Sequence, residues 1–507
     1  MSATLDRTET LGPALLARLP QSVRRPGYDR GALKVGMAHL GVGAFHRCHQ
    51  AEFTDDVLEQ RFDRWGVVGI NVRPPRLADT LGRQDGLYTR LLRDGDSVDA
   101  RVIGCLVAAI DSEDSPEPAL HALASADIDV ATLTITEKGY CHQPATGEID
   151  LTHPDIIHDL AHPSTPRSVP GLVAAALERR MLSHGQPITF MSCDNIPSNG
   201  VILEAVVRAI AGKRGADLSR WIDDNVAFPS TMVDRIVPAT ASADIAAVEN
   251  AYGYRDSAMV VGEPFRQWVI ENRFAGRRPP WDLAGATFVD DVTPFELIKM
   301  RVLNAAQTAF ACLGLLAGHE HTCDDLTDPL LTGFVRRMLV EESLPTLPPV
   351  PGIDAIAYLD QSFGRLRNTA IRHRNHQIAT DGSRKIVQRI LNPIRERLAR
   401  GESVERLTVI VAAWMVYLVA ASKRFGERWA VEDPFAGEAA LIADRVGRDS
   451  AALVAAFLQH ESIFDPDLAG RPAFRSLVAR HLDGLLSPDP VGYVRQFAGD
   501  DDHGRTT

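Results

Sequence analysis

Short apolar or β-branched runs alternate with longer helical stretches between residues 33 and 291, a pattern typical of a parallel sheet covered by helices. Most of these runs are bounded by Gly, Pro or Asp. The clearest of them cover residues 33–40, 66–72, 128–136, 188–192 and 286–289. The pattern predicts an α/β fold in which the N-terminal domain, residues 1–291, is Rossmann-like with a mostly parallel sheet.

The strand pattern fades after Pro294, and apolar positions then recur with a period near 3.6. The two clearest helical segments are FELIKMRVLNAAQTAFACLGLLAG (residues 295–318) and LTVIVAAWMVYLVAASKRF (residues 407–425). A proline-rich loop at residues 344–351 separates them. We therefore expect a mainly α-helical C-terminal domain over residues 292–507.

The length and composition predict two large soluble domains. A chain of 507 residues is too long for one ordinary hydrophobic core, and 45% of its residues are apolar. A net charge of −12 disfavours nucleic acid and anionic lipid as partners. The longest apolar stretches, such as residues 407–421, are interrupted or too short to span a bilayer. The first twelve residues lack the apolar block of a secretion signal. These features indicate a cytoplasmic protein that acts on a small molecule, with no membrane or nucleic-acid partner.

The six cysteines are scattered along the chain without CxxC pairs or the spacing of zinc ligands. This distribution predicts plain thiols, with no disulfide scaffold and no metal site.

A glycine-containing turn follows the first predicted strand, in the segment VGMAHLGVGAFHRCHQ. Gly41 and Gly43 precede a helix that should begin near Ala44, where free N–H groups and close backbone approach suit a pyrophosphate. His46 stands where the third glycine of GxGxxG would be, so the motif alone is weak. An ordinary strand-to-helix turn is the alternative.

The second predicted strand, WGVVGINVR, ends without the acidic residue that usually binds the ribose of NAD. Asn71 could donate a hydrogen bond to a ribose, whereas Arg73 or Arg76 could accommodate the 2′-phosphate of NADP. The sequence leaves both cofactors open.

A third signature begins the second domain, where Thr293, Pro294 and Glu296 have the order of an N-cap, a first helical residue and a capping-box acid. The helix should run to about Ala317 and stop at Gly318. It is apolar almost all round and should be buried.

Three polar residues, Lys299, Asn304 and Gln307, interrupt this helix. Steps of five and eight residues rotate by roughly 140° and 80° on an α-helix, which keeps the three side chains within one arc. Burial lowers the pKa of a lysine, so Lys299 could act as a general base, and Asn304 could donate to a developing alkoxide. The alternative is that Lys299 extends to solvent and Asn304 bonds to a neighbouring backbone group.

Two further candidates follow predicted strands, because ligands of open α/β sheets bind beyond the carboxyl ends of strands. Glu137 lies in TLTITEKGY and Asn195 in ITFMSCDNIPSNG. Glu137 could relay a proton or tune Lys299, and Asn195 could be a second amide donor; an ordinary turn role is the alternative for each.

These segments together resemble the polyol-specific long-chain dehydrogenases and reductases, the family of mannitol 2-dehydrogenase and fructuronate reductase. The matching segments, in family order over most of the chain, are GVGAFHRCHQ, QDGLYTR, TEKGYC, SCDNIPSNG, FPSTMVDRIVP, VTPFELIKMRVLN and DGSRK. The resemblance implies a zinc-independent, monomeric oxidoreductase that uses NAD, or else NADP. The reaction would interconvert a secondary alcohol of a polyol or aldonate and the matching ketose or keto-uronate, of mannitol/fructose or mannonate/fructuronate type.

The resemblance also assigns roles by motif to residues of both predicted domains, with residues 292–507 as the helical substrate and catalytic domain. It implies Lys299 as the general base, Asn195 and Asn304 as oxyanion donors, and Glu137 as a proton relay. It also implies that Asp234 and Lys385 contact substrate or shape the site. From the residues themselves we add Gln307 and Arg374 for substrate, and Gly41, Gly43, Phe45 and Arg73 for the cofactor.

One position departs from the family pattern, because Gln307 stands where histidine is usual. Glutamine forms hydrogen bonds but does not titrate near neutral pH, which puts substrate orientation in doubt. The segment at residues 371–394 resembles the fructuronate reductase branch. Its basic residues suit a uronate carboxylate, although a solvated helix face or a neutral polyol substrate is the alternative; they are Arg372, His373, Arg374, His376, Lys385 and Arg389. A sugar-phosphate dehydrogenase and a dinucleotide-binding protein without turnover are the rival functions.

Overall fold

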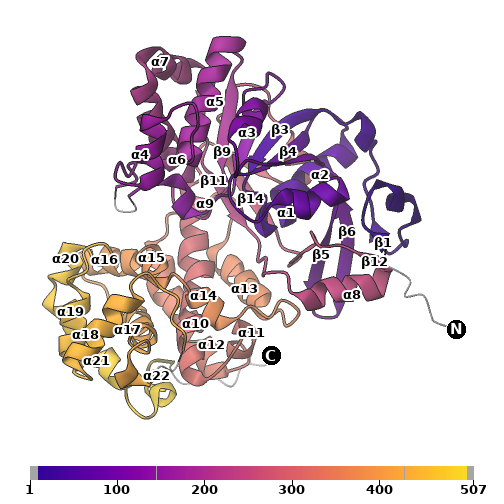
Figure 1. Ribbon diagram of the computed structural model, residues 1–507. Helices are drawn as coiled ribbons and strands as arrows, with labels where there is room; N and C mark the ends of the chain where they lie inside the picture. Colours follow the sequence, from indigo (N-terminus) through magenta and orange to yellow (C-terminus); the bar gives the residue numbers. More distant parts are fainter. Residues whose placement is uncertain (1–8, 144–145, 427–428, 499–507) are drawn as a thin grey trace. The chain divides into compact units, whose positions relative to one another are not determined.

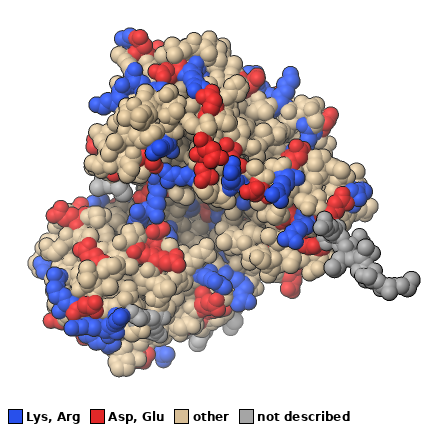
Figure 2. All heavy atoms as spheres, in the orientation of Figure 1, with Lys and Arg blue, Asp and Glu red and all other residues tan. Residues whose placement is uncertain are grey.

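The chain folds into two compact units, Met1–Thr293 and Pro294–Thr507. The structure is a computed structural model that describes residues 9–143, 146–426 and 429–498. Figure 1 follows the chain from the α/β unit into the helical unit. Acidic and basic side chains are interspersed on the face drawn in Figure 2, so the net negative charge is not gathered into one patch there.

A six-stranded sheet forms the centre of the first unit, and every neighbouring pair of its strands is parallel. Its order is β10 (Val226–Ala227), β9 (Ile188–Ser192), β8 (Val130–Leu133), β3 (Val35–Leu40), β4 (Gly66–Asn71) and β7 (Leu106–Asp111). Counted along the chain, this is the order 6-5-4-1-2-3 of a doubly wound dinucleotide-binding sheet. The predicted Rossmann-like architecture is confirmed.

Helices cover both faces of this sheet, as Figure 1 shows. Helices α1 (Ala44–Cys48) and α2 (Gln50–Gln60) pack with Met37 and Val67 on one face. The other face, with Ala38 and Val68, packs against α3 (Glu117–Leu123), α5 (Val169–Ser183) and α6 (Asn199–Arg214). Because adjacent residues of a strand point to opposite faces, strands buried on both sides appear in the sequence as continuous apolar runs.

The prediction for residues 286–289 needs a correction, since this strand lies outside the parallel sheet. β15 (Thr287–Val289) joins β14 (Gln267–Glu271) and β11 (Thr231–Asp234) in a separate three-stranded sheet. The sequence also gave no signal for the four-stranded sheet of β13 (Val260–Gly262), β5 (Tyr88–Asp94), β6 (Ser97–Ile103) and β2 (Val23–Arg24). Buried Arg90 and Arg101 interrupt the apolar alternation of the β5–β6 hairpin, which obscured its period of two.

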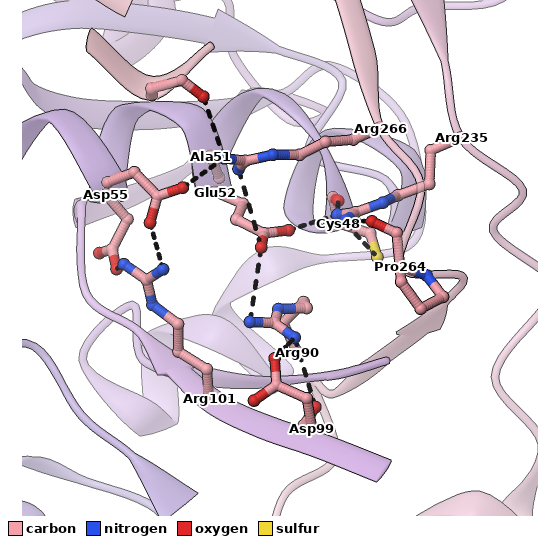
Figure 3. Close-up of polar contacts among 12 residues, drawn as sticks. Cys48, Ala51, Glu52, Asp55, Arg90, Asp99, Arg101, Arg235, Pro264 and Arg266 are labelled. Atoms are coloured by element: carbon pink, nitrogen blue, oxygen red, sulfur yellow. Dashed lines mark hydrogen bonds and ion pairs between the residues drawn. The ribbon is translucent and has the colours of Figure 1, made fainter. Parts of the chain in front are cut away.

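A buried ion-pair network explains how those arginines are accommodated (Figure 3). Glu52 on α2 pairs with Arg90 at 3.4 Å, with Arg266 at 3.7 Å and closely with Arg235. Burial raises the pKa of Glu52, but the three guanidinium groups outweigh that effect and lower it to about 2. One carboxylate thus fastens α2 to β5 and to the segment that joins β11 and β14.

The second unit is helical throughout its described part, which confirms the predicted helical domain. Its first helix runs through α9 (Thr293–Ile298), a π-helical turn η7 (Lys299–Asn304) and α10 (Ala305–Ala317). The helices that follow are α11 (Thr322–Asp325), α12 (Pro329–Met338), α13 (Ala355–Leu366), α14 (Asn375–Ala379), α15 (Gly382–Ile386), α16 (Asn392–Ala399), α17 (Glu405–Val419), α18 (Ala436–Val446), α19 (Ser450–Phe457), α20 (Pro466–Ala469), α21 (Pro472–Leu485) and α22 (Pro490–Ala498).

The long helix differs slightly from its prediction at its start. It begins at Thr293, whose N–H donates to the carboxylate of Asp291 at 2.8 Å, so Asp291 supplies the cap expected from Thr293. It ends at Gly318, which has a positive φ of 85°. Within the described residues, Thr293–Ala317 is the one helix long and apolar enough to cross a membrane, with a mean hydropathy of 1.3. The fold buries 94% of its most apolar 18-residue window, as is usual for a core helix of a soluble protein.

Candidate active site

The glycine turn at the end of β3 requires its first glycine. Gly41 has a φ of 87°, and a Cβ added there would lie 2.2 Å from the carbonyl oxygen of Thr134. The Gly41 N–H donates to Ile70 O at 2.9 Å, and the Gly41 carbonyl accepts from the Thr134 hydroxyl at 2.7 Å. These bonds fix the turn between the first, second and fourth strands of the sheet.

Asn71 completes this turn from the end of β4. Its Oδ1 accepts the Val42 N–H at 2.8 Å, and its Nδ2 donates to Pro75 O at 3.0 Å. The structure therefore gives Asn71 a role in shaping the glycine turn, in place of the ribose contact considered from the sequence.

Gly43, by contrast, has room around it. A Cβ added there would approach no atom closer than 3.9 Å, and the residue is exposed at the start of α1. The first N–H groups of a helix have no partner within it, so this end offers donors beside open space. A pyrophosphate fits such a cradle.

The position of the missing third glycine is filled by a stacked histidine pair. The rings of His39 and His46 lie 3.4 Å apart with an interplanar angle of 14°. Burial lowers the pKa of His39 to about 3 and that of His46 well below its usual range, so both rings are neutral. Beside them Phe45 stacks on His49, with ring centroids 5.0 Å apart. The helix therefore packs on the strand through neutral rings where other Rossmann proteins use glycine.

A cavity of about 690 Å³ opens at the carboxyl ends of β4 and β7, where the ribose of a dinucleotide would be expected. Its lining includes Arg73, Ser112, Glu113, Asp114 and Asp155. The Ser112 hydroxyl is buried without a hydrogen-bond partner, as expected for a group that awaits a polar ligand. Arg73 contacts Asp155, so its charge is already balanced.

Glu137 and Asn195 follow neighbouring parallel strands, as predicted. β8 and β9 pair in register up to Leu133 and Ser192, and the loops that continue them are tied together by Asp194. Its carboxylate accepts the N–H groups of Ile135 at 3.0 Å and Thr136 at 2.8 Å. The structure thus brings Glu137 and Asn195 to one edge of the sheet.

Asp234 ends β11, and its side chain is buried. The next residue, Arg235, holds this end in place through Glu52, the Cys48 carbonyl and Phe265 O, the last at 3.0 Å. Sequence reasoning missed both Asp194 and Arg235, although each stands directly beside a residue that it singled out. Adjacency to a candidate was the one available signal.

In the second unit, Lys299 and Asn304 are 6% and 4% exposed, so Lys299 does not extend to solvent as one alternative expected. They are the first and last residues of the π-helical turn. Closure of such a turn from residue i to i+5 places residues five apart near one another, whereas α geometry would separate them by roughly 140°. Gln307 follows, half-buried, in the first turn of α10.

The basic residues of the segment 371–394 include both buried and exposed side chains. Lys385 donates to the carbonyls of Ile378, at 3.2 Å, and Thr380, and burial lowers its pKa to about 8. Arg374, expected to bind substrate, is 68% exposed and lies 3.6 Å from Glu320. Arg389 is the arginine of this segment that reaches the long helix, since it donates to Asn304 O at 3.3 Å.

All six cysteines are free and buried. Within the described part of the chain, no group of three or more His, Cys, Asp or Glu side chains is placed to hold a metal ion.

A doubly wound parallel sheet, a glycine turn at the end of its first strand and a helical unit with a buried lysine define a two-domain protein of the Rossmann class. The chain belongs to the mannitol dehydrogenase family: residues 35–283 match its Rossmann domain and residues 291–486 its C-terminal domain.

Relatives of known name resemble almost the whole chain. This chain is 40% identical to D-mannonate oxidoreductase of Escherichia coli, and the match covers 88% of this chain and 92% of that protein. It is 35% identical to mannitol 2-dehydrogenase of Phaeosphaeria nodorum, with 94% and 84% covered. Among solved structures, Pseudomonas fluorescens mannitol 2-dehydrogenase in a ternary complex with NAD and D-mannitol superposes with a TM-score of 0.88. The identity there is 35%, and 96% of this chain and 99% of that chain are covered.

Proposed function

We propose that this protein is an NAD-dependent oxidoreductase that interconverts a secondary alcohol of a polyol or aldonate and the corresponding ketose or keto-acid. The observation that carries the proposal is the position of buried Lys299 and Asn304 at the two ends of one π-helical turn, in a chain that also has a dinucleotide-type sheet. Relatives named for D-mannonate and mannitol support the substrate class.

In this proposal residues 1–291 bind the dinucleotide, and residues 292–507 bind substrate and carry the catalytic lysine. The turn of Gly41 and Gly43 with the start of α1, including Phe45, would hold the pyrophosphate. Nicotinamide, when bound, supplies the acceptor or donor of a hydride. The solved relative that contains NAD supports this cofactor.

The carboxylates beside Arg73 also favour NAD over NADP. Asp155 pairs with Arg73, and Asp114 pairs with Arg76 at 3.1 Å. Because both guanidinium groups are already neutralised, they would attract a 2′-phosphate only weakly, while Glu113 would repel it.

The chain's own side chains account for the proton and the charge. Lys299 acts as the general base that takes the proton of the substrate hydroxyl, and in the reverse direction it returns that proton. The amides of Asn195 and Asn304 donate hydrogen bonds to the alkoxide as its charge develops. Glu137 would relay the proton to solvent. Asp234, Gln307 and Lys385 would orient the remaining hydroxyls.

We further infer that the protein works as a cytoplasmic monomer on a small molecule, as its family resemblance and acidic balance suggest. Light scattering of the purified protein measures the oligomeric state, and a stable dimer would contradict this inference.

The test of the function is the absorbance of reduced nicotinamide with NADH or NADPH and a panel of ketoses and keto-uronates, including fructose, fructuronate, tagaturonate and xylulose. We expect rapid oxidation of NADH with at least one member. Turnover confined to sugar phosphates would favour a sugar-phosphate dehydrogenase. Nucleotide binding without turnover of any member would favour a non-catalytic dinucleotide-binding protein.

A further inference from the structure

Arg389 is a buried cation whose hydrogen-bond partners are uncharged. It belongs to the π-helical turn η10 (Val387–Leu391) and is 7% exposed. Its Nη1 donates to Asn304 O at 3.3 Å and to the Thr308 hydroxyl at 3.1 Å. Burial alone lowers its pKa, to about 10. Among the described residues it therefore has no carboxylate partner.

Other buried arginines of the same unit are paired. Arg301 makes two hydrogen bonds to Glu396, at 2.8 Å and 2.6 Å, and Arg397 lies 3.1 Å from Glu402. Buried charges in proteins are normally paired or else bind a ligand of opposite charge. The unpaired charge of Arg389 is thus an exception at the helix that carries Lys299.

Two more basic side chains, Lys385 and His373, add to the positive charge around Arg389. Lys385, one turn before Arg389, has its pKa lowered to about 8 by burial and then by Arg389. His373 has its pKa lowered to about 4 by burial and then by Lys385. Asp381 and Asp433 act in the opposite direction on Lys385 but more weakly.

Asp433 already accepts hydrogen bonds from the backbone of its own unit. Its carboxylate accepts the N–H groups of Ser383 and Phe435, each at 2.8 Å. The local field at Lys385 and Arg389 therefore stays positive, which favours an anion.

We propose that Arg389 determines substrate specificity by binding the carboxylate of a sugar acid, so that aldonates and their keto-acids are preferred over neutral polyols. This inference rests on the proposed function of the same site. A guanidinium has five N–H donors, and those of Nη1 are directed to Asn304 O and Thr308, so the other edge remains for a two-point contact with carboxylate. The Arg389 Nη1 donates a hydrogen bond to the backbone carbonyl of Asn304. A carboxylate bound by Arg389 would therefore have a fixed position relative to the Asn304 side-chain amide, which would bind the reacting oxygen.

The experiment compares kcat/KM for D-mannonate and D-mannitol with NAD in wild type, Arg389→Gln, Arg389→Lys and the control Arg397→Gln. We expect wild type to prefer D-mannonate. Arg389→Gln should lower the ratio of the two kcat/KM values at least about tenfold, the loss expected for one charged hydrogen-bonded contact. Arg389→Lys should retain only part of the ratio, because lysine keeps the charge but loses the two-point contact, and Arg397→Gln should leave the ratio unchanged. An equal loss for both substrates in Arg389→Gln would reduce Arg389 to a structural role and overturn the proposal.

Calorimetric titration of the NADH complex with D-mannonate separates this inference from the proposed function. Binding of D-mannonate that weakens in Arg389→Gln supports the inference even if no turnover is found. A wild-type enzyme that oxidises D-mannitol but does not bind D-mannonate would overturn the inference and leave the function intact. Tighter binding of D-mannitol 1-phosphate than of D-mannonate would also overturn it, in favour of a phosphate site.

Discussion

Lys299 and the two glycines of the turn have different expected roles, and single substitutions distinguish these roles. Lys299 should act on substrate alone, whereas Gly41 should shape the protein and Gly43 should only make room for the dinucleotide. Each role predicts a different pattern of folding, nucleotide binding and turnover.

Replacement of Lys299 by alanine should lower kcat about 100-fold or more, because the proton acceptor is lost. Nucleotide affinity should change little, since the lysine would not touch the cofactor. Stopped-flow turnover and a fluorescence titration with NADH measure the two quantities. Turnover at the wild-type rate would remove Lys299 from the mechanism.

The two glycines give a matched pair. Gly41→Ala should destabilise the first unit by at least about 1–2 kcal/mol, because a side chain is strained at positive φ and would collide with Thr134. Gly43→Ala should leave the melting temperature near that of wild type but weaken NADH binding at least about tenfold. Unchanged NADH affinity in Gly43→Ala would place the pyrophosphate elsewhere.

The sequence identified most residues of the candidate site, because strand ends and helix starts follow from local patterns. Glu137, Asn195 and Gly41 all lie where their strands predicted. Arg374 and Arg389 could not be told apart, since exposure within a basic segment depends on tertiary packing. The structural use of Asn71 depends likewise on a bond across the turn.

At the scale of elements, the long helix shows what a periodic pattern can and cannot reveal. Its limits near Thr293 and Gly318 follow from its caps, and its burial follows from its apolar surface. The π-helical turn was not predictable, because the angular argument assumed α geometry throughout. That turn brings Lys299 and Asn304 closer in angle than predicted and shifts Gln307 relative to Lys299.

Gln307→His should therefore change relative activity among substrates while the fold is kept, because position 307 is half-buried one turn beyond Asn304. A histidine there adds a group that titrates near neutral pH, so the activity should also acquire a pH dependence near 6.5. Profiles of kcat/KM against pH for a panel of substrates measure both effects. Identical profiles for variant and wild type would show that position 307 does not contact substrate.

At the scale of the whole molecule, the apolar pattern predicted the doubly wound sheet and the helical unit, but not the β5–β6 hairpin. That hairpin is held by buried ion pairs, and their partners lie far apart in the sequence: Glu52 with Arg90, Arg235 and Arg266 (Figure 3). Patterns within one element carry no information about such pairs.

Glu52→Gln should destabilise the first unit by about 3–5 kcal/mol, because three arginines lose their shared carboxylate. Glu117→Gln removes an exposed pair with Arg179 and should cost far less stability, because solvent screens that pair. Urea unfolding of both variants and of wild type compares the two. Equal losses would mean that the buried network contributes no more than a surface pair.

The same network predicts a dependence on acid. The pKa of Glu52 is lowered in the fold from 4.5 to about 2, so its contribution is complete above pH 4.5 and is lost as the pH falls toward 2. The stability difference between wild type and Glu52→Gln should therefore shrink between these two pH values. A difference that stays constant would show that Glu52 is not the titrating group.

Oxidation of a secondary alcohol by hydride transfer to NAD is tested most directly with a substrate that carries deuterium on the carbinol carbon that is oxidised. D-mannonate and D-mannitol so labelled are incubated with the enzyme and NAD, and the NADH formed is analysed by mass spectrometry. We expect NADH that carries the deuterium, with no such product from Lys299→Ala on the same time scale. Unlabelled NADH, or oxidation without any NADH, would contradict it.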